Sequence, residues 1–188
     1  MPALIKHSYL RDSFLELNWK NVDFANENSF PPVNWAALQK YAINLKKAQQ
    51  GVLTTICTLR PEYNMGGLHL VRLLEFNDSS KWVARIQLGT CTAESTKRLL
   101  HEVHTLSLVR ERSRIPVPQV YGYESTDKNA VGAAFFLLEF IPGNTAMDAF
   151  GGWDFHGGEI PQEHRPKFYC ETAAIQVLRA SEILGDRD

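Results

Sequence analysis

The chain has 188 residues, a length typical of one domain or of one domain with part of a second. Its 20 Lys and Arg nearly balance its 21 Asp and Glu, and the formal net charge is −1. This balance argues against a nucleic-acid-binding protein and gives no reason to expect an anionic membrane as a partner. The apolar fraction of 44% and the charged fraction of 22% match ordinary globular proteins, so disorder of the whole chain is not expected.

The cysteines and the apolar segments indicate the cellular setting. Cys57, Cys91 and Cys170 are widely spaced and form no Cys-x-x-Cys pair, so we expect neither a zinc knuckle nor a dithiol redox motif. The N-terminal residues lack the apolar stretch of a signal peptide, and no segment has the ~18 apolar residues that predict a membrane span. The sequence therefore predicts a cytoplasmic protein with unpaired thiols.

The first third of the chain predicts two helices. Residues 1–33 are aromatic-rich and irregular, with one short helix expected over Tyr9–Trp19. Asn34 then matches a helix N-cap, and apolar residues recur at helical spacing over residues 35–48. Gly51 matches the glycine that commonly follows a helix, so a helix ending there is predicted.

From Val52 the pattern becomes extended and predicts a three-stranded antiparallel meander, because short polar turns join successive β-rich runs. A long helix follows, ended by the Ile115-Pro-Val-Pro segment, which cannot remain helical. The predicted strands are 52–63, 68–76, 81–88, 119–123 and 134–141, and the predicted helices are 94–112 and 167–184, after a loop over 144–166. Antiparallel strands with one intervening helix indicate the α+β class.

Glu102 lies within the apolar stripe of the predicted 94–112 helix, between Leu106 and Val109 on a helical wheel. A buried carboxylate without a partner is costly, so Glu102 either protonates, finds a cation or reaches water at the edge of the stripe. Arg85 supplies a candidate cation, because it alternates with apolar residues in the strand just before this helix. Arg85 could instead reach solvent; the two residues together favour an ion pair.

A glycine-containing turn joins the first two strands of the predicted meander, at Asn64, Met65, Gly66 and Gly67. Backbone N–H groups exposed in such a turn can hold phosphate oxygens. Two adjacent glycines between strands also occur in ordinary hairpin turns, so the turn alone does not assign a function.

Several segments together resemble the aminoglycoside phosphotransferase family of kinase-like enzymes, in its fungal form. They are Trp82-Val-Ala-Arg-Ile, the helix with Glu102, Ile115-Pro-Val-Pro-Gln-Val and Val131-Gly-Ala-Ala-Phe-Phe-Leu-Leu-Glu-Phe-Ile-Pro-Gly. The resemblance extends over about residues 51–184, and its most specific part is Leu-Glu-Phe-Ile-Pro-Gly. It implies a kinase-like N-lobe over 51–143, with a five-stranded antiparallel sheet and one packed helix. A helical extension (1–50) would precede it, and a linker with the first helix of a truncated C-lobe (144–188) would follow.

The resemblance also implies an ATP site. Asn64, Met65, Gly66 and Gly67 would form the loop that covers the nucleotide. Arg85 would take the place of the kinase lysine that contacts the α- and β-phosphates, with Glu102 as its helix partner. Val83 would lie over the adenine, and Glu139 and Ile141 would offer backbone groups to the adenine edge.

The catalytic part of such an enzyme is missing from the sequence. Phosphoryl transfer in this fold uses an aspartate base on a His-x-Asp-type loop and a later metal-binding aspartate, and no His-x-Asp occurs here. Asp154-Phe-His-Gly resembles the metal-binding motif but precedes the last helix, so it is assigned to a loop. The family uses Mg²⁺, but its ligands are absent. The remaining histidines, at 101, 104, 156 and 164, do not suggest a metal site.

Three functions follow from these observations: an ATP-dependent phosphotransferase of a small-molecule hydroxyl, a non-catalytic module that binds nucleotide or a partner, and a fragment of a longer enzyme. The missing catalytic loop favours the latter two for this chain. The apolar final helix predicts self-association through the surface that would face a C-lobe, because exposed apolar patches mark interaction sites.

Overall fold

The computed structural model describes residues 20–21, 32–51, 56–143 and 157–184. It confirms the α+β class and the antiparallel sheet. The sheet has the strand order β1-β2-β3-β4-β6-β5, and every neighbouring pair is antiparallel. The strands are β1 (Lys20–Asn21), β2 (Cys57–Met65), β3 (His69–Phe76), β4 (Lys81–Gln87), β5 (Val120–Glu124) and β6 (Phe135–Glu139); the helices are α1 (Trp35–Gln50), α2 (Ala93–Arg112) and α4 (Arg165–Leu184).

The five predicted strands are all present, and β1 is an additional short strand in a segment predicted to be irregular. Lys20 of β1 pairs with Tyr63 at the outer edge of β2. Two residues do not offer a readable alternating pattern, so this strand has no signal in the sequence. The short helix predicted over Tyr9–Trp19 lies outside the described residues.

The turn predicted at Asn64–Gly67 is displaced toward the C-terminus. Asn64 and Met65 belong to β2, where they pair with Val71 and Leu70 of β3. The strand is longer than predicted because these residues continue the ladder up to the glycines. The loop therefore consists of Gly66, Gly67 and Leu68 alone.

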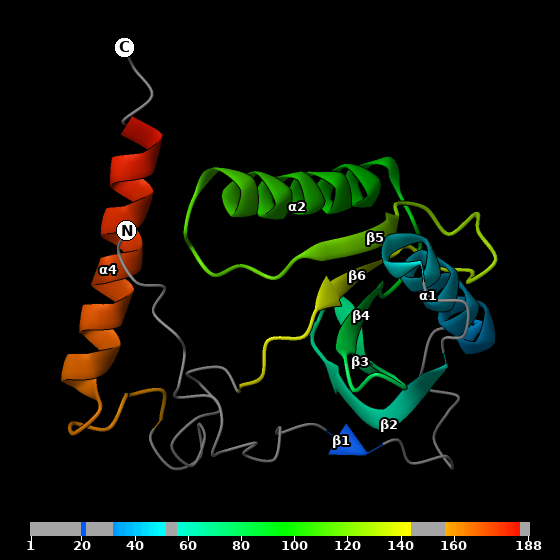
Figure 1. The fold of residues 1–188 in the computed structure, drawn as a ribbon, viewed down its shortest axis with the longest axis horizontal. Helices are drawn as coiled ribbons and strands as arrows, with labels where there is room; N and C mark the ends of the chain where they lie inside the picture. Colours follow the sequence, from blue (N-terminus) through cyan, green and yellow to red (C-terminus); the bar gives the residue numbers. More distant parts are fainter. Residues whose placement is uncertain (1–19, 22–31, 52–55, 144–156, 185–188) are drawn as a thin grey trace.

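The two faces of the sheet carry two separate cores. On one face, Trp82, Ala84 and Ile86 of β4 join a buried cluster with Leu38 and Ala42 of α1. On the other face, Leu99 and Val103 of α2 pack on Ala134, Phe136 and Leu138 of β6. Figure 1 shows α1 and α2 on different sides of the sheet. The prediction of one packed helix is therefore wrong, because α1 covers the second face.

Local sequence sets both ends of α1 as predicted. The Asn34 side chain accepts a hydrogen bond from the Ala37 amide at 3.0 Å, and Gly51 adopts a left-handed conformation with φ of 66° after the last turn. In the middle of α1, Leu45 lies so close to β5 that a Cβ added at Gly122 would be 2.6 Å from its Cδ2 atom. Glycine at 122 thus permits the close packing of α1 on the sheet edge.

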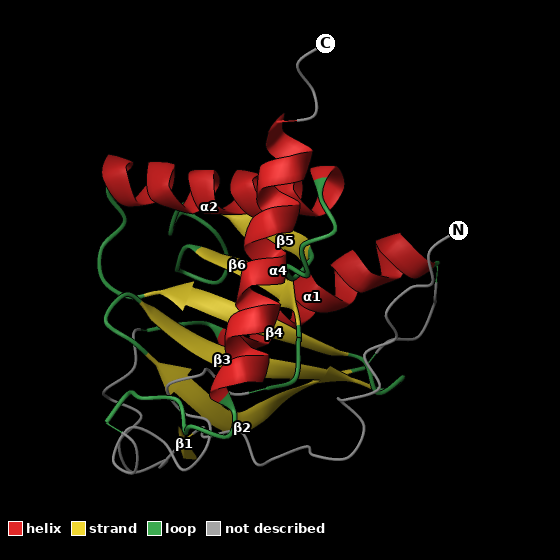
Figure 2. Ribbon diagram, turned by 90° about the vertical axis from the view of Figure 1, so that its left-hand side faces the viewer, coloured by secondary structure: helices red, strands yellow, loops and turns green. Residues whose placement is uncertain are grey.

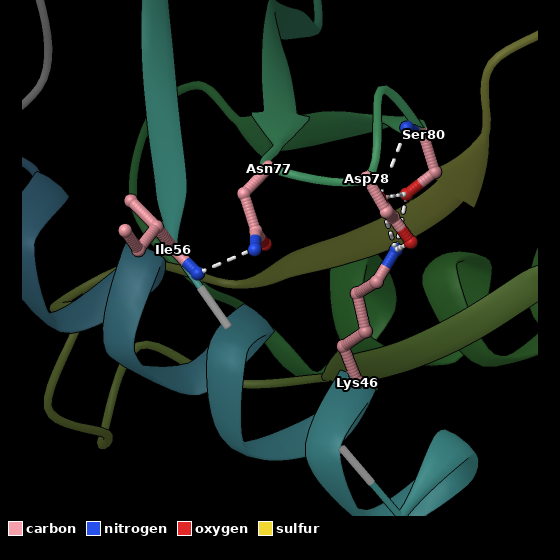
Figure 3. Close-up of polar contacts among 5 residues, drawn as sticks. All are labelled: Lys46, Ile56, Asn77, Asp78 and Ser80. Atoms are coloured by element: carbon pink, nitrogen blue, oxygen red, sulfur yellow. Dashed lines mark hydrogen bonds and ion pairs between the residues drawn. The ribbon is translucent and has the colours of Figure 1, made fainter. Parts of the chain in front are cut away.

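A cluster of polar side chains connects α1 with the turn between β3 and β4 (Figure 3). Lys46 is only 2% exposed, and its ammonium lies 2.8 Å from Asp78 Oδ2 and donates to Ser80 Oγ. The ammonium also lies 4.2 Å from the centre of the Phe76 ring. The buried charge is therefore both paired and in contact with an aromatic face, as the burial of an ammonium requires.

The last helix, α4, begins at Arg165, two residues before its predicted start, with Pro166 in its first turn (Figure 2). Proline is compatible with this position because the first-turn amides have no intrahelical partner. None of the described side chains of α4 belongs to either core, and Tyr169, Ile175 and Val177 are exposed. No helix of the described part is long and apolar enough to span a membrane.

Candidate functional site

Arg85 and Glu102 come together where α2 crosses the sheet. Alternation along β4 places Val83 and Arg85 on the face that α2 covers, as predicted. In register, Arg85 lies opposite Val71 of β3 and Phe136 of β6, so it occupies the middle of that face. α2 is capped at Thr92 by reciprocal hydrogen bonds with Ser95, which fixes where the helix begins.

The predicted ion pair between these two residues is confirmed. Arg85 Nη1 donates to Glu102 Oε1, and both side chains are about one-third exposed (32% and 33%). The guanidinium carbon lies 5.2 Å from the centre of the Phe136 ring, so one side of the cation rests on an aromatic face. The carboxylate that appeared misplaced in the apolar stripe of α2 thus has a partner.

His69, at the start of β3, is the third polar member of this site. Its Nδ1 lies 3.2 Å from Arg85 Nη2, and its ring meets Phe136 edge-on with centres 6.2 Å apart. Burial lowers the pKa of His69, and the positive charge of Arg85 lowers it further. The sequence analysis missed His69, although alternation along β3 places it on the same face as Val71, opposite Gln87 in the neighbouring strand.

The glycine turn lies beside this site, since His69 follows it directly. The Gly66 amide donates to the His69 carbonyl at 3.0 Å, so this predicted phosphate-binding N–H is already used. Neither Gly66 nor Gly67 has a positive φ, and a Cβ at either position would meet no atom within 4 Å. The fold of the described chain therefore does not require glycine at these positions.

Glu139 and Ile141, the residues predicted at the adenine edge, lie at the end of β6 and just after it. Glu139 is the last residue of this strand, and its amide donates to the Gln119 carbonyl at 2.8 Å. Its carboxylate accepts from Arg110 Nη1 and the Gln119 amide, each at 3.0 Å. The Glu139 amide is thus used within the sheet, and the prediction that backbone groups of Glu139 and Ile141 meet the adenine edge stays a prediction. Ile141 follows the strand and is exposed.

A shallow open recess of about 400 Å³ adjoins this strand end. Its lining includes Lys81, two residues before Val83, and the two neighbours of Ile141 in the chain, Phe140 and Pro142. Glu75, whose carboxylate lies 3.7 Å from Lys81 Nζ, and Ser79 are the other polar residues that line the recess. Val83 and Ile141 are thus near this lining in the chain but do not themselves line the recess.

The chemistry available at this site is anion binding. Arginine carries five N–H donors in a planar fork, and the two contacts with Glu102 and His69 do not exhaust them. Within the described ranges, no three His, Cys, Asp or Glu side chains gather in a way that could hold a metal ion. The described site thus offers the hydrogen-bond donors of a permanent cation.

Comparison with known proteins gives a limited match. No family model matches the chain. The chain is 30% identical over 80 residues to a subtelomeric hrmA-associated cluster protein of Aspergillus fumigatus, which matches equally in two strains of that fungus. The match covers 43% of this chain and 16% of the relative's length. The matched segment thus corresponds to a small part of that longer relative, whose name states no activity.

Proposed function

We propose that residues 51–143 form the nucleotide-binding lobe of a kinase-like phosphotransferase, similar to the aminoglycoside phosphotransferase family. The observation that carries this proposal is the Arg85–Glu102 ion pair, which joins the third strand of a meander to the helix that follows it. Protein kinases use a lysine on the third strand and a glutamate on the next helix in the same way to hold the α- and β-phosphates of ATP.

Arginine suits this role because its fork can contact a carboxylate and a phosphate together. Glu102 holds one edge of the guanidinium, and the Phe136 ring limits its movement from another side. The remaining N–H groups of Arg85 can then donate to phosphate oxygens in charge-assisted hydrogen bonds. Arg85 is thus the phosphate-binding residue of the proposed site.

Two further features support ATP as the ligand. The recess lined by Lys81, Phe140 and Pro142 offers a place for the adenine near the end of β6. Neither the φ angles nor the packing of the hairpin requires glycine at 66 and 67. The absence of side chains at these positions leaves room for a ligand to approach the hairpin. Asn64 and Met65 would contribute through the strand rather than through the turn.

The chain itself is proposed to bind nucleotide without catalysing phosphoryl transfer. Its sequence has no His-x-Asp motif to supply the base that accepts the proton of the substrate hydroxyl. Among the described residues, no three His, Cys, Asp or Glu side chains gather as a metal-binding group. Phosphorylation of a small-molecule hydroxyl would require the further residues of a longer protein. Without those residues, the lobe acts as a pseudokinase-like module.

Calorimetric titration of the purified chain with ATP tests the proposal. We expect measurable binding that Arg85→Ala weakens about tenfold or more, as the loss of a hydrogen bond to a charged group implies. Arg165→Ala is the matched control, because Arg165 pairs with Glu159 next to α4 rather than with a residue of the sheet. Circular dichroism establishes that both variants remain folded. Absence of binding by the folded chain, or equal binding by wild type and Arg85→Ala, would overturn the proposal.

A further inference from the structure

The contact between Arg85 and His69 has a defined direction. Arg85 Nη2 lies 3.2 Å from His69 Nδ1, and the two residues come from neighbouring strands of the sheet. Arginine is always protonated and has no acceptor, so in this contact the guanidinium donates. His69 Nδ1 must then present a lone pair, which a neutral ring does only when its proton is on Nε2.

We propose that His69 is a positioning residue for Arg85: its neutral Nε2–H tautomer accepts a hydrogen bond from Nη2 and fixes the guanidinium against Glu102. Two acceptors then hold two different nitrogens of the fork, one from β3 and one from α2. A planar group held at two nitrogens, with Phe136 against it, has little rotational freedom left. Its remaining donors are therefore oriented before a ligand arrives, which lowers the entropic cost of binding.

Burial and two neighbouring cations favour the neutral form of the His69 ring. Arg85 approaches from β4, and Arg98 and Glu102 approach from α2, where they lie one helical turn apart. Burial has the largest effect and lowers the pKa of His69; Arg85 and Arg98 act in the same direction, and Glu102 opposes them. On β6, the neighbour is the uncharged Phe136 ring. The net effect lowers the pKa of His69 and favours the neutral ring.

Protonation of His69 removes the contact outright. A second proton on the ring places an N–H at Nδ1, opposite the N–H of Arg85, and two donors with like charge repel each other. Glu102 then has two cations to pair with instead of one. Acidification below the His69 pKa therefore loosens Arg85, while its charge is unchanged.

Nuclear magnetic resonance of the ligand-free full chain tests the inference directly. Long-range ¹H–¹⁵N spectra report which ring nitrogen carries the proton, and we expect Nε2–H for His69 at pH 7.5. We expect the His69 pKa to lie below 6.5, the ordinary value for a histidine. In Arg85→Ala the His69 pKa should rise, because a neighbouring positive charge is gone. An Nδ1–H tautomer, or a His69 pKa that Arg85→Ala leaves unchanged, would overturn the inference.

Two variants separate positioning from packing. His69→Phe keeps an aromatic ring against Phe136 but offers no acceptor, whereas His69→Gln offers a carbonyl acceptor without titrating. Hydrogen exchange of the Arg85 side-chain N–H groups should quicken in His69→Phe and stay slow in His69→Gln at pH 6–7.5. His104→Phe is the control and should leave this exchange unchanged. Equal exchange in wild type and a folded His69→Phe would show that His69 does not hold Arg85.

The link to ligand binding rests on the proposed function and is measured separately. With ATP as the probe, His69→Phe should raise the dissociation constant about fivefold to tenfold, as the loss of one positioning hydrogen bond implies. His69→Gln should restore most of the affinity. If the wild-type chain does not bind ATP, the proposed function fails, while the tautomer and exchange measurements still decide whether His69 positions Arg85. Equal affinity in wild type and His69→Phe would overturn the positioning of a phosphate-binding Arg85.

Discussion

The Arg85–Glu102 pair is neither fully buried nor fully exposed, and this sets its expected energy. Pairs on the surface contribute ~0–1 kcal/mol, and breaking a buried pair costs ~3–5 kcal/mol. With each side chain about one-third exposed, we expect Arg85→Ala or Glu102→Ala to cost roughly 1–2 kcal/mol. A double-mutant cycle by urea unfolding measures the coupling. The pair Lys167–Glu171, whose side chains are 63% and 67% exposed, is the control and should couple weakly; equal coupling in both cycles would contradict this ranking.

Asp78 gives the fold a pH dependence in the acid range. Its hydrogen bonds with Lys46, and then with Ser80, lower its pKa from 3.8 to about 2. A depressed carboxylate pKa stabilises the fold above 3.8, and this stabilisation is lost as the pH falls through about 2. Protonation or Asp78→Asn leaves the buried Lys46 ammonium without a counter-ion.

We therefore expect Asp78→Asn to destabilise the chain by roughly 1–3 kcal/mol at pH 6, less than a fully buried pair because the carboxylate is half-exposed. The difference from wild type should shrink as the pH is lowered toward 2. Denaturant unfolding at several pH values measures both effects. Glu163→Gln, which changes a carboxylate that is 72% exposed, should have little effect at any of these values. A difference that does not depend on pH would contradict the role of the Asp78 charge.

At the candidate site, the sequence pointed to charged residues that stand in otherwise apolar stretches. Glu102 in an apolar stripe and Arg85 in an apolar strand both signal a need for a partner, and they find each other. His69 gave no such signal, because a histidine at a strand end is compatible with solvent. Its role depends on the pairing of β3 with β4 and on α2 covering this face of the sheet, and a residue at a strand end shows neither in the sequence.

At the scale of elements, capping and alternation predicted most of the fold. Asn34 and Gly51 mark the ends of α1, and both occupy the expected capping positions. Local signals of this kind do not show which faces meet in three dimensions. The packing of α1 on the sheet was not predicted for this reason. It depends on the close approach of Leu45 to Gly122, two residues that are far apart in the sequence.

Gly122→Ala tests how tightly α1 packs on β5. The new Cβ would lie 2.6 Å from Leu45 Cδ2 and 3.2 Å from Tyr41 Oη, so α1 or these side chains must move. We expect a loss of about 1–3 kcal/mol in the free energy of unfolding, as overpacking of a core typically costs. Adding Leu45→Ala should recover part of it. Gly66→Ala is the matched control, because its Cβ meets no atom within 4 Å; similar losses in both variants would argue against close packing at 122.

At the scale of the whole molecule, α4 differs from α1 and α2 in having no core to cover among the described residues. Its Tyr169, Ile175 and Val177 are 59%, 41% and 66% exposed, although their side chains are apolar or aromatic. The same resemblance that suggests a nucleotide-binding lobe places this helix at the start of a second lobe. Its apolar side chains would then pack against that lobe in a longer protein, and in the isolated chain they are available to a second copy.

We therefore expect the isolated chain to self-associate through α4. Size-exclusion chromatography with light scattering should show a mass that rises with protein concentration. The double variant Ile175→Lys with Val177→Lys should shift the chain toward the monomer, because a charge on each apolar position makes its burial against another copy unfavourable. Ala173→Lys, at an exposed position on the same helix, is the control for added charge. A wild-type chain that is monomeric at every concentration, or a control that dissociates the assembly as well as the double variant, would show that these apolar residues are not the contact.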